Sequence, residues 1–239
     1  MGEGCASDAE LMNYVSSVNI ACGYHAGDAE TMRKTVETAV KKGVAIGAHP
    51  GYRDREGFGR RAMKMSPDEI FDIVTRQVVA LRNICVETGR SLKHVKPHGG
   101  LYNQSAKDAE TANAIAMAVR SIDPDLILFG LSGSTSISEA KKCGLRTASE
   151  VFADRTYQPD GSLTPRTEAN ALIHDTHISA AQVLTMIRKH SVTTVTGEEI
   201  PIIAETICIH GDGENALKFA RSIRYLLTEN EIEIVPING

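Results

Sequence analysis

The chain has 239 residues, of which 42% are hydrophobic, and its 26 basic and 30 acidic side chains give a net charge of −4. This length and apolar content support one large domain with its own core, so they exclude a disordered chain, a fibre and a disulfide-stapled miniprotein. A near-balanced charge and only 5% aromatic residues offer neither a basic surface for a phosphate backbone nor stacking platforms for bases. We therefore expect no nucleic-acid partner.

The sequence shows no feature of a membrane or secreted protein. The longest stretch without Asp, Glu, Lys or Arg, 11–27, is shorter than the ~20 apolar residues of a membrane-spanning helix. Glu3 stands where a signal peptide would carry positive charge, and no apolar run follows. The five cysteines are scattered without a Cys-x-x-Cys pair, which argues against disulfides and a thiolate zinc site. We expect a cytoplasmic protein with reduced cysteines.

Short apolar runs alternate along the chain with longer segments of helical period. They predict strands and helices in this order: strand 17–22, helix 28–42, strand 44–48, helix 66–88, strand 94–97, helix 108–122, strand 126–130, helix 134–143, strand 145–149, helix 177–190, strand 206–209 and helix 215–229. Ser66-Pro67-Asp68-Glu69 is a capping box with proline at the first helical position. This alternation is typical of a parallel sheet covered by crossover helices, either a barrel or an open doubly wound sheet.

Two segments depart from the alternation. The runs 192–195 and 200–204 flank a turn, which predicts a β-hairpin inserted near 192–204, and a further strand is expected at 232–235. We find no linker, composition shift or internal repeat, so we expect residues 1–239 to form a single domain.

Chemically active side chains gather at the expected carboxyl ends of the strands, where parallel α/β folds place their active sites. Lys96 and His98 share one face of their strand by its period of two, and the lysine needs a carboxylate or an anionic ligand because an unpaired buried ammonium is costly. A buried Lys–Glu pair without a catalytic role is the alternative. In chain order, the candidates are His25, His49, Lys96, His98, Glu150, Asp154, Arg155, His210 and Asp212.

Arginines supply a second group of candidates. The glycine-rich loop after the second strand contains Arg60 and Arg61, and the long loop 157–170, which we expect to act as a lid, contains Arg166. Guanidinium groups suit carboxylate or phosphate, so we predict that these three residues and Arg155 bind an anionic substrate. The alternative for such a loop is a solvated basic surface.

Groups from several strand ends on one rim indicate an enzyme. Two chemistries fit them: metal-assisted hydrolysis through histidines and carboxylates, and acid–base catalysis on an amide with lysine and arginine holding an anion. Neither His-x-x-x-His on a helix nor His-x-x-Glu-His occurs, so the sequence gives only a weak metal signal and leaves it open whether a metal is bound.

Spaced segments of the chain resemble the LamB/YcsF family. The segments are 8–12, 19–28, 47–52, 57–61, 95–99, 149–155 and 207–212, and together they span essentially the whole chain. The resemblance implies an irregular seven-stranded β/α barrel of the glycoside hydrolase/deacetylase type. It also implies a role in an ATP-dependent 5-oxoprolinase, which hydrolyses the lactam of 5-oxoproline (pyroglutamate) to L-glutamate and combines this chain with subunits B and C.

The resemblance also raises the question of where ATP binds. The chain has neither a Gly-x-x-x-x-Gly-Lys-[Ser/Thr] loop nor a kinase-type glycine loop, so we expect ATP, with Mg²⁺, to bind mainly with a partner subunit. Our hypothesis is that a partner activates the lactam by phosphorylation and this chain completes ring opening. Lys96 and the arginines would hold carboxylate or phosphate, and a histidine, Glu150 or Asp154 would activate water.

Two alternatives to this hypothesis stay open, as does homo-oligomer formation. The first is a metal-dependent deacetylase or amidohydrolase that acts alone and uses His25, His49, His98 and His210 as ligands. The second is a non-catalytic scaffold subunit that binds a small acid.

The chain departs from the family pattern at its start. Family members typically begin earlier, with a strand of the type Asp-x-Asn-x-Asp-x-Gly-Glu-Gly, and Glu3 is what this chain retains of that acidic set. We therefore count Glu3 among the candidate catalytic residues. We also expect the barrel to lack its first strand and to have an unpaired edge.

Overall fold

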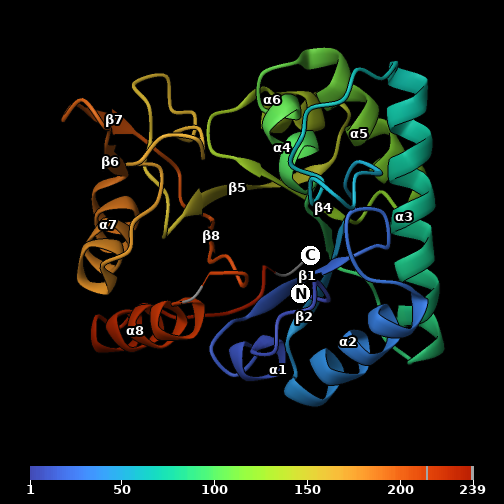
Figure 1. Ribbon diagram of the computed structural model, residues 1–239, viewed down its shortest axis with the longest axis horizontal. Coiled ribbons are helices and arrows are strands. Elements are labelled where there is room, and N and C mark those ends of the chain that lie inside the picture. Colours follow the sequence, from blue (N-terminus) through green and yellow to red (C-terminus); the bar gives the residue numbers. More distant parts are fainter. Residues whose placement is uncertain (214, 238–239) are drawn as a thin grey trace.

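The computed structural model describes residues 1–213 and 215–237. Its main sheet contains six parallel strands in the order β1 (Ser17–Ala21), β2 (Ala45–His49), β3 (His94–Val95), β4 (Ile127–Leu131), β5 (Arg146–Phe152) and β8 (Thr206–Cys208). The sheet curls into a half-barrel with helices on its outer face (Figure 1). The predicted α/β class and parallel sheet are confirmed. The expected seventh barrel strand is not part of this sheet in the described residues.

The helices follow the predicted order, with two short additions. They are α1 (Asp8–Leu11), α2 (Ala29–Lys42), α3 (Pro67–Glu87), α4 (Gly99–Ser105), α5 (Ala109–Ile122), α6 (Thr135–Lys142), α7 (Thr176–Lys189) and α8 (Ala216–Glu229). The capping box forms at the start of α3, where the backbone N–H of Ser66 donates to Glu69 Oε2 at 2.7 Å. Sequence reasoning missed α1 and α4 because each is too short to show a helical period.

The predicted third strand 94–97 ends earlier than expected, at Val95. Beyond it the chain continues beside the end of β2 and the start of the loop that follows, where the N–H of Lys96 donates to Ala48 O at 2.9 Å and that of His98 to Pro50 O at 2.8 Å. Pro97 has no N–H to extend the ladder. Lys96 and His98 are therefore held by backbone hydrogen bonds although they lie outside a regular strand.

Residues 191–204 form the predicted hairpin as a separate antiparallel pair, β6 (Ser191–Thr193) and β7 (Glu199–Pro201). The prediction of a strand at 232–235 is wrong, because this segment has no strand pairing. Its isoleucines instead pack on a cluster that α8 and α7 share, which contains Val183, Phe219 and Ile223.

The half-barrel is open between its edge strands, β1 and β8. Met1 lies along the free edge of β1: its amine donates to Asn19 O at 2.9 Å, and the N–H of Ala21 donates to Met1 O at 3.0 Å. This is the bonding pattern of a parallel ladder. A cavity of about 770 Å³ extends between the two edges and is lined by both of them and by α8.

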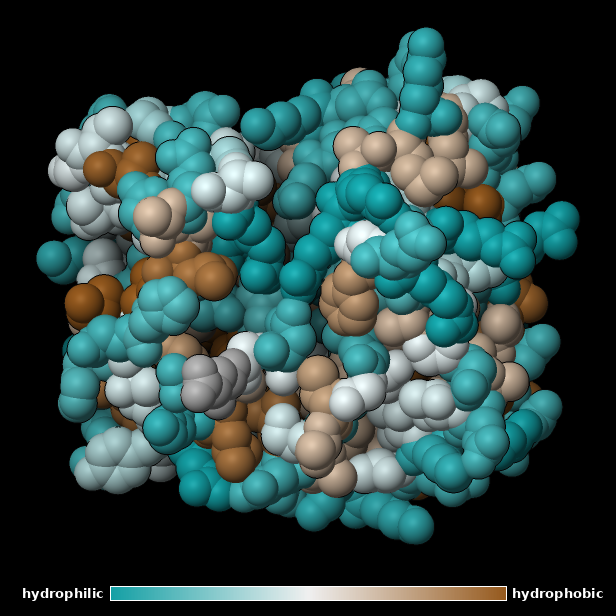
Figure 2. Space-filling model, viewed as in Figure 1, coloured by the Kyte–Doolittle hydropathy of each residue, from teal (hydrophilic) through white to brown (hydrophobic). Residues whose placement is uncertain are grey.

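The apolar core is distributed unevenly. One continuous cluster joins β1–β4 to α2, α3 and α5 and includes the fully buried Val74, Val78 and Leu81 of α3. Smaller clusters support β5, β8, α7 and α8. Apolar side chains remain visible at the surface beside α8 (Figure 2). None of the helices in the described part of the chain combines the length and apolar character needed to cross a membrane.

Candidate active site

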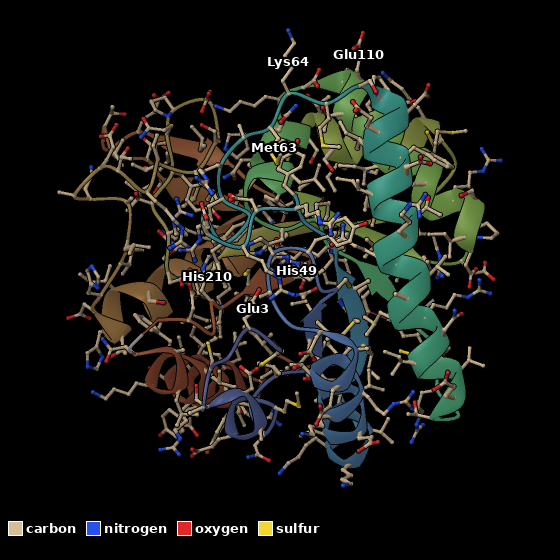
Figure 3. The ribbon with its side chains drawn as sticks, turned by 45° about the vertical axis from the view of Figure 1, so that its right-hand side comes forward. Glu3, His49, Met63, Lys64, Glu110 and His210 are labelled. Carbon is tan, nitrogen blue, oxygen red and sulfur yellow. The ribbon has the colours of Figure 1, made fainter. Side chains whose placement is uncertain are left out.

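The large cavity collects most of the residues predicted from the strand ends. Its lining includes Glu3, His49, Arg60, Lys96, His98, Glu150, Arg155, Arg166, His210 and Asp212. In Figure 3, Glu3, His49 and His210 lie near the middle of the molecule although they come from distant parts of the chain. His25 and Asp154 lie directly behind lining residues that they contact. Arg61 is not part of the lining.

Four of these side chains form a buried group, which we call the histidine cluster: Glu3, His25, His49 and His98. His25 Nε2 lies 3.0 Å from Glu3 Oε1, and the rings of His25 and His98 stack with their centroids 3.8 Å apart. His98 Nδ1 lies 3.0 Å from His49 Nε2 and 3.8 Å from Glu3 Oε1. In three of these residues, Glu3, His49 and His98, the potential ligand atoms lie close enough together to hold a metal ion.

Backbone geometry makes room for the histidine cluster. A Cβ atom on Gly59 would lie 2.8 Å from His25 Cβ and 2.9 Å from His98 Cδ2, and the φ of Gly59 is +63°. Only glycine fits both the close approach and the left-handed backbone. The glycine-rich loop after β2 thus packs against the histidine rings.

Burial and neighbouring charges set the protonation of this cluster. Burial lowers the pKa of His98 to about 3 and holds the pKa of His49 well below its usual value. For Glu3, burial by itself raises the pKa, but the hydrogen bond with His25 and the Met1 amine outweigh it, and the pKa falls to about 2. At neutral pH, Glu3 is therefore a carboxylate beside two neutral rings.

A second group, the lysine cluster, consists of Lys96, Glu150, Cys208 and Tyr102. Lys96 Nζ donates to Glu150 Oε1 at 2.7 Å and to Cys208 Sγ at 3.0 Å, so the buried ammonium has the carboxylate that the sequence required. Burial by itself lowers the pKa of Lys96, yet Cys208 and Glu150 hold it above its usual value. Glu150 Oε2 and the Tyr102 hydroxyl have no hydrogen-bond partner among the described residues.

Asp154 and His210 form a third group at the cavity wall. His210 Nδ1 lies 2.9 Å from both carboxylate oxygens of Asp154, and the imidazole stacks on Phe152 with the ring centroids 5.6 Å apart. Burial by itself raises the pKa of Asp154, but the contact with His210 holds it below its usual value. A carboxylate that accepts from Nδ1–H leaves Nε2 as the basic nitrogen, an arrangement suited to proton transfer.

The four predicted arginines separate into two pairs. Arg155 donates Nε to Ala171 O at 3.1 Å and also donates to Thr164 O, so it ties the loop 157–170 to the residue that follows it. Arg61 pairs with Asp54 away from the cavity. Arg60 and Arg166 line the cavity as Arg155 does, but only the Arg155 guanidinium is engaged by these two loop carbonyls.

Of Arg60 and Arg166, only Arg60 has an acidic partner among the described ion pairs, which is Asp212. Burial and the charge of Arg60 lower the pKa of Arg166. Two neighbouring guanidinium groups at a cavity wall are suited to bind an anion.

Sequence reasoning missed two members of the lysine cluster. Tyr102 lies on the unpredicted helix α4, and its cavity position depends on Gly99 and Gly100, where a Cβ would lie 2.6 Å from Gly59 O and 2.7 Å from Arg61 O. In the sequence, the adjacent glycines Gly99 and Gly100 were the signal for this close backbone packing. Cys208 was interpreted only as a reduced thiol, and nothing local in the sequence indicates that it contacts Lys96.

Comparison with known proteins agrees with this fold. The sequence model of the LamB/YcsF family matches residues 1–239. The crystal structure of a lactam utilization protein from Thermus thermophilus is similar at 40% identity with a TM-score of 0.92, covering 98% of this chain and 96% of that chain.

More distant structures share the fold alone. An Enterococcus faecalis V583 protein, named for a proposed role in cellobiose-phosphate cleavage, aligns at 12% identity with a TM-score of 0.52, covering 96% of this chain and 92% of that chain. The match to the whole chain and the identity to the Thermus protein go far beyond such a shared fold. The chain belongs to the LamB/YcsF family.

Proposed function

We propose that the chain is the lactam-hydrolysing subunit of a cytoplasmic, ATP-dependent 5-oxoprolinase that opens 5-oxoproline to L-glutamate together with subunits B and C. The observation that supports it best is the cavity itself, where a buried ammonium, a His–Asp pair and two arginines surround one space. The name of the Thermus relative, a lactam utilization protein, supports the same substrate class.

The chemical parts of 5-oxoproline match the groups in the cavity. Arg60 and Arg166 bind its carboxylate, and Phe152 and Leu131, both cavity-lining, cover its apolar ring. Lys96 lies within the cavity wall and stabilises negative charge that develops on the lactam oxygen. An ammonium held by Glu150 and Cys208 is preorganised for this task.

Ring opening adds one water molecule across the amide C–N bond. His210 Nε2 takes a proton from the water as the oxygen bonds to the carbonyl carbon, and Asp154 stabilises the imidazolium. The C–N bond then breaks and the same proton passes to the ring nitrogen, which becomes the amine of glutamate. ATP with Mg²⁺ binds mainly with a partner subunit, which transfers the γ-phosphoryl group to the lactam oxygen and releases ADP before water attacks. The ring-opened product then carries the phosphoryl group on its side-chain carboxyl, and a second water molecule hydrolyses this acyl phosphate to L-glutamate and inorganic phosphate.

A three-component assay tests this proposal: the chain is mixed with subunits B and C, and glutamate release from 5-oxoproline and ATP is measured. We expect release from the complete mixture and a loss of roughly 10²-fold or more in kcat for His210→Ala. Full activity of both His210→Ala and Lys96→Met would contradict the catalytic assignment and favour the scaffold alternative.

Arg166→Ala tests the carboxylate site separately. We expect KM for 5-oxoproline to rise about tenfold or more with a smaller change in kcat, because a charge-assisted contact of roughly 1.5–3 kcal/mol is lost. Arg61→Ala is the matched control, since Arg61 pairs with Asp54 outside the cavity. An equal rise in KM for both variants would show a general charge effect and remove Arg166 from the site.

A further inference from the structure

The two rings of the histidine cluster that face each other have an unusual hydrogen-bond pattern. His49 Nε2 and His98 Nδ1 are 3.0 Å apart. The other nitrogen of each ring lies 2.7 Å from a backbone carbonyl oxygen, that of Lys96 for His49 and that of Phe58 for His98. A carbonyl oxygen only accepts hydrogen bonds, so these outer nitrogens carry the ring protons. In neutral imidazoles, the facing nitrogens therefore present two lone pairs to each other.

Two lone pairs at this distance repel each other unless a positive species lies between them. Glu3 adds a carboxylate to the same point, because single ligand atoms of Glu3, His49 and His98 all lie within 4.8 Å of one another. The result is a buried convergence of three electron-pair donors without a hydrogen-bond donor among them. A proton satisfies only one pair of such atoms, whereas a metal cation accepts all three.

We infer that Glu3, His49 and His98 bind one divalent transition-metal cation, with Zn²⁺ the best match to two imidazoles and a carboxylate. Neighbouring nitrogen ligands, each about 2.1 Å from a metal, lie about 3.0–3.4 Å apart, and the observed separation of 3.0 Å fits that range. All three residues line the cavity, so the cation has an entry path and an open side. This inference does not depend on the proposed lactam hydrolysis.

The surroundings of the three ligands support cation binding. The carbonyl partners of His49 and His98 fix the tautomer and orientation of each ring, as the outer partners of metal-bound histidines do. His25 does the same for the carboxylate through its contact with Glu3 Oε1 at 3.0 Å. Lys96 and Arg60 are already paired, with Glu150 and Asp212, which reduces their repulsion of a bound metal. The Met1 amine, 3.8 Å from Glu3 Oε2, donates to Asn19 O.

Metal titration of the chelator-stripped full chain tests the inference. Calorimetry with ZnCl₂ and visible absorption with Co²⁺ should show saturable binding at about one equivalent, with Co²⁺ bands typical of nitrogen ligands. We expect His49→Ala and His98→Ala to weaken binding by roughly 100-fold or more. His25→Ala, which removes a positioning contact, should weaken it by about 10–100-fold. His177→Ala, an exposed histidine on α7, is the matched control and should bind like the wild type.

Glu3→Gln guards against variants that fail to fold, because it keeps the size of the side chain and weakens the ligand. Circular dichroism of each metal-free variant reports folding independently. If the wild type binds Zn²⁺ no more tightly than folded His49→Ala, or if His177→Ala abolishes binding, the inference is wrong and the two rings share a proton instead. Glutamate release is not used as a readout, so this failure is distinct from a failure of the proposed function.

Discussion

The lysine cluster and the histidine cluster lie in the wall of the same cavity, but they satisfy their buried polar atoms in opposite ways. Lys96 donates to Glu150 and Cys208, so its charge is neutralised by groups of the chain itself. His49 and His98 use their N–H groups on backbone carbonyls and turn lone pairs toward each other. The ammonium of Lys96 is therefore held in place by the chain and is preorganised to face a substrate. The facing acceptor atoms of His49 and His98 are instead suited to bind a cation.

Disrupting the lysine cluster should have the greatest consequence. Lys96→Met leaves the Glu150 carboxylate buried without its partner and should lower the free energy of unfolding by about 3–5 kcal/mol. Urea denaturation measures the change. Lys93→Met, on an exposed lysine of the preceding segment, is the control and should stay within about 0.5 kcal/mol of the wild type.

A double variant tests the cause of this loss. Lys96→Met combined with Glu150→Leu removes both charges, so most of the lost stability should return while lactam hydrolysis remains absent. No recovery of stability in the double variant would show that Lys96 acts through packing and not through its charge.

A smaller loss is expected from crowding the histidine cluster. Gly59→Ala places a methyl group against His25 and His98 and should cost about 1–3 kcal/mol for overpacking, in addition to the strain of alanine at positive φ. Gly133→Ala has a similar φ, +73°, but open space around its Cβ, so it isolates the backbone strain. Equal losses in thermal or urea unfolding would show that the loop does not press on the rings.

Acid should weaken the Asp154–His210 pair more gradually. The pKa of Asp154 in the folded chain lies below its ordinary value of 3.8, so its contribution to stability is complete above that value and is lost as the pH falls through the folded pKa. The wild type should therefore lose stability more steeply than Asp154→Asn as the pH falls below about 4. Parallel curves for the two proteins in urea unfolding would contradict the pairing.

The mildest change is expected at the sulfur of the lysine cluster. Cys208→Ala removes one of the acceptors of the Lys96 ammonium and should lower stability by about 0.5–1.5 kcal/mol, whereas Cys208→Ser retains an acceptor and should lose less. Equal losses for the two variants would show that Sγ contributes by filling space.

Much of the fold could be predicted because its elements are long and periodic. The strands and the long helices fall within a few residues of the predicted bounds, and the capping box before α3 forms as expected. Short elements such as α1 and α4 could not be predicted, since fewer than two or three turns give no period. The strand expected near the end of the chain failed because an apolar alternation also fits a segment that packs on helices.

The order of residues along the chain predicted most of the charged and histidine side chains that line the cavity, but it missed Tyr102 and Cys208 and wrongly included Arg61. Parallel strands put their carboxyl ends on one rim, and an ammonium in an apolar segment must find a carboxylate. The pairings became known only from the folded chain: Glu150 for Lys96, Asp54 for Arg61, loop carbonyls for Arg155, and opposed lone pairs for His49 and His98. Local periodicity sets the direction of a side chain, but hydrogen bonds depend on ångström-scale distances between segments far apart in the chain.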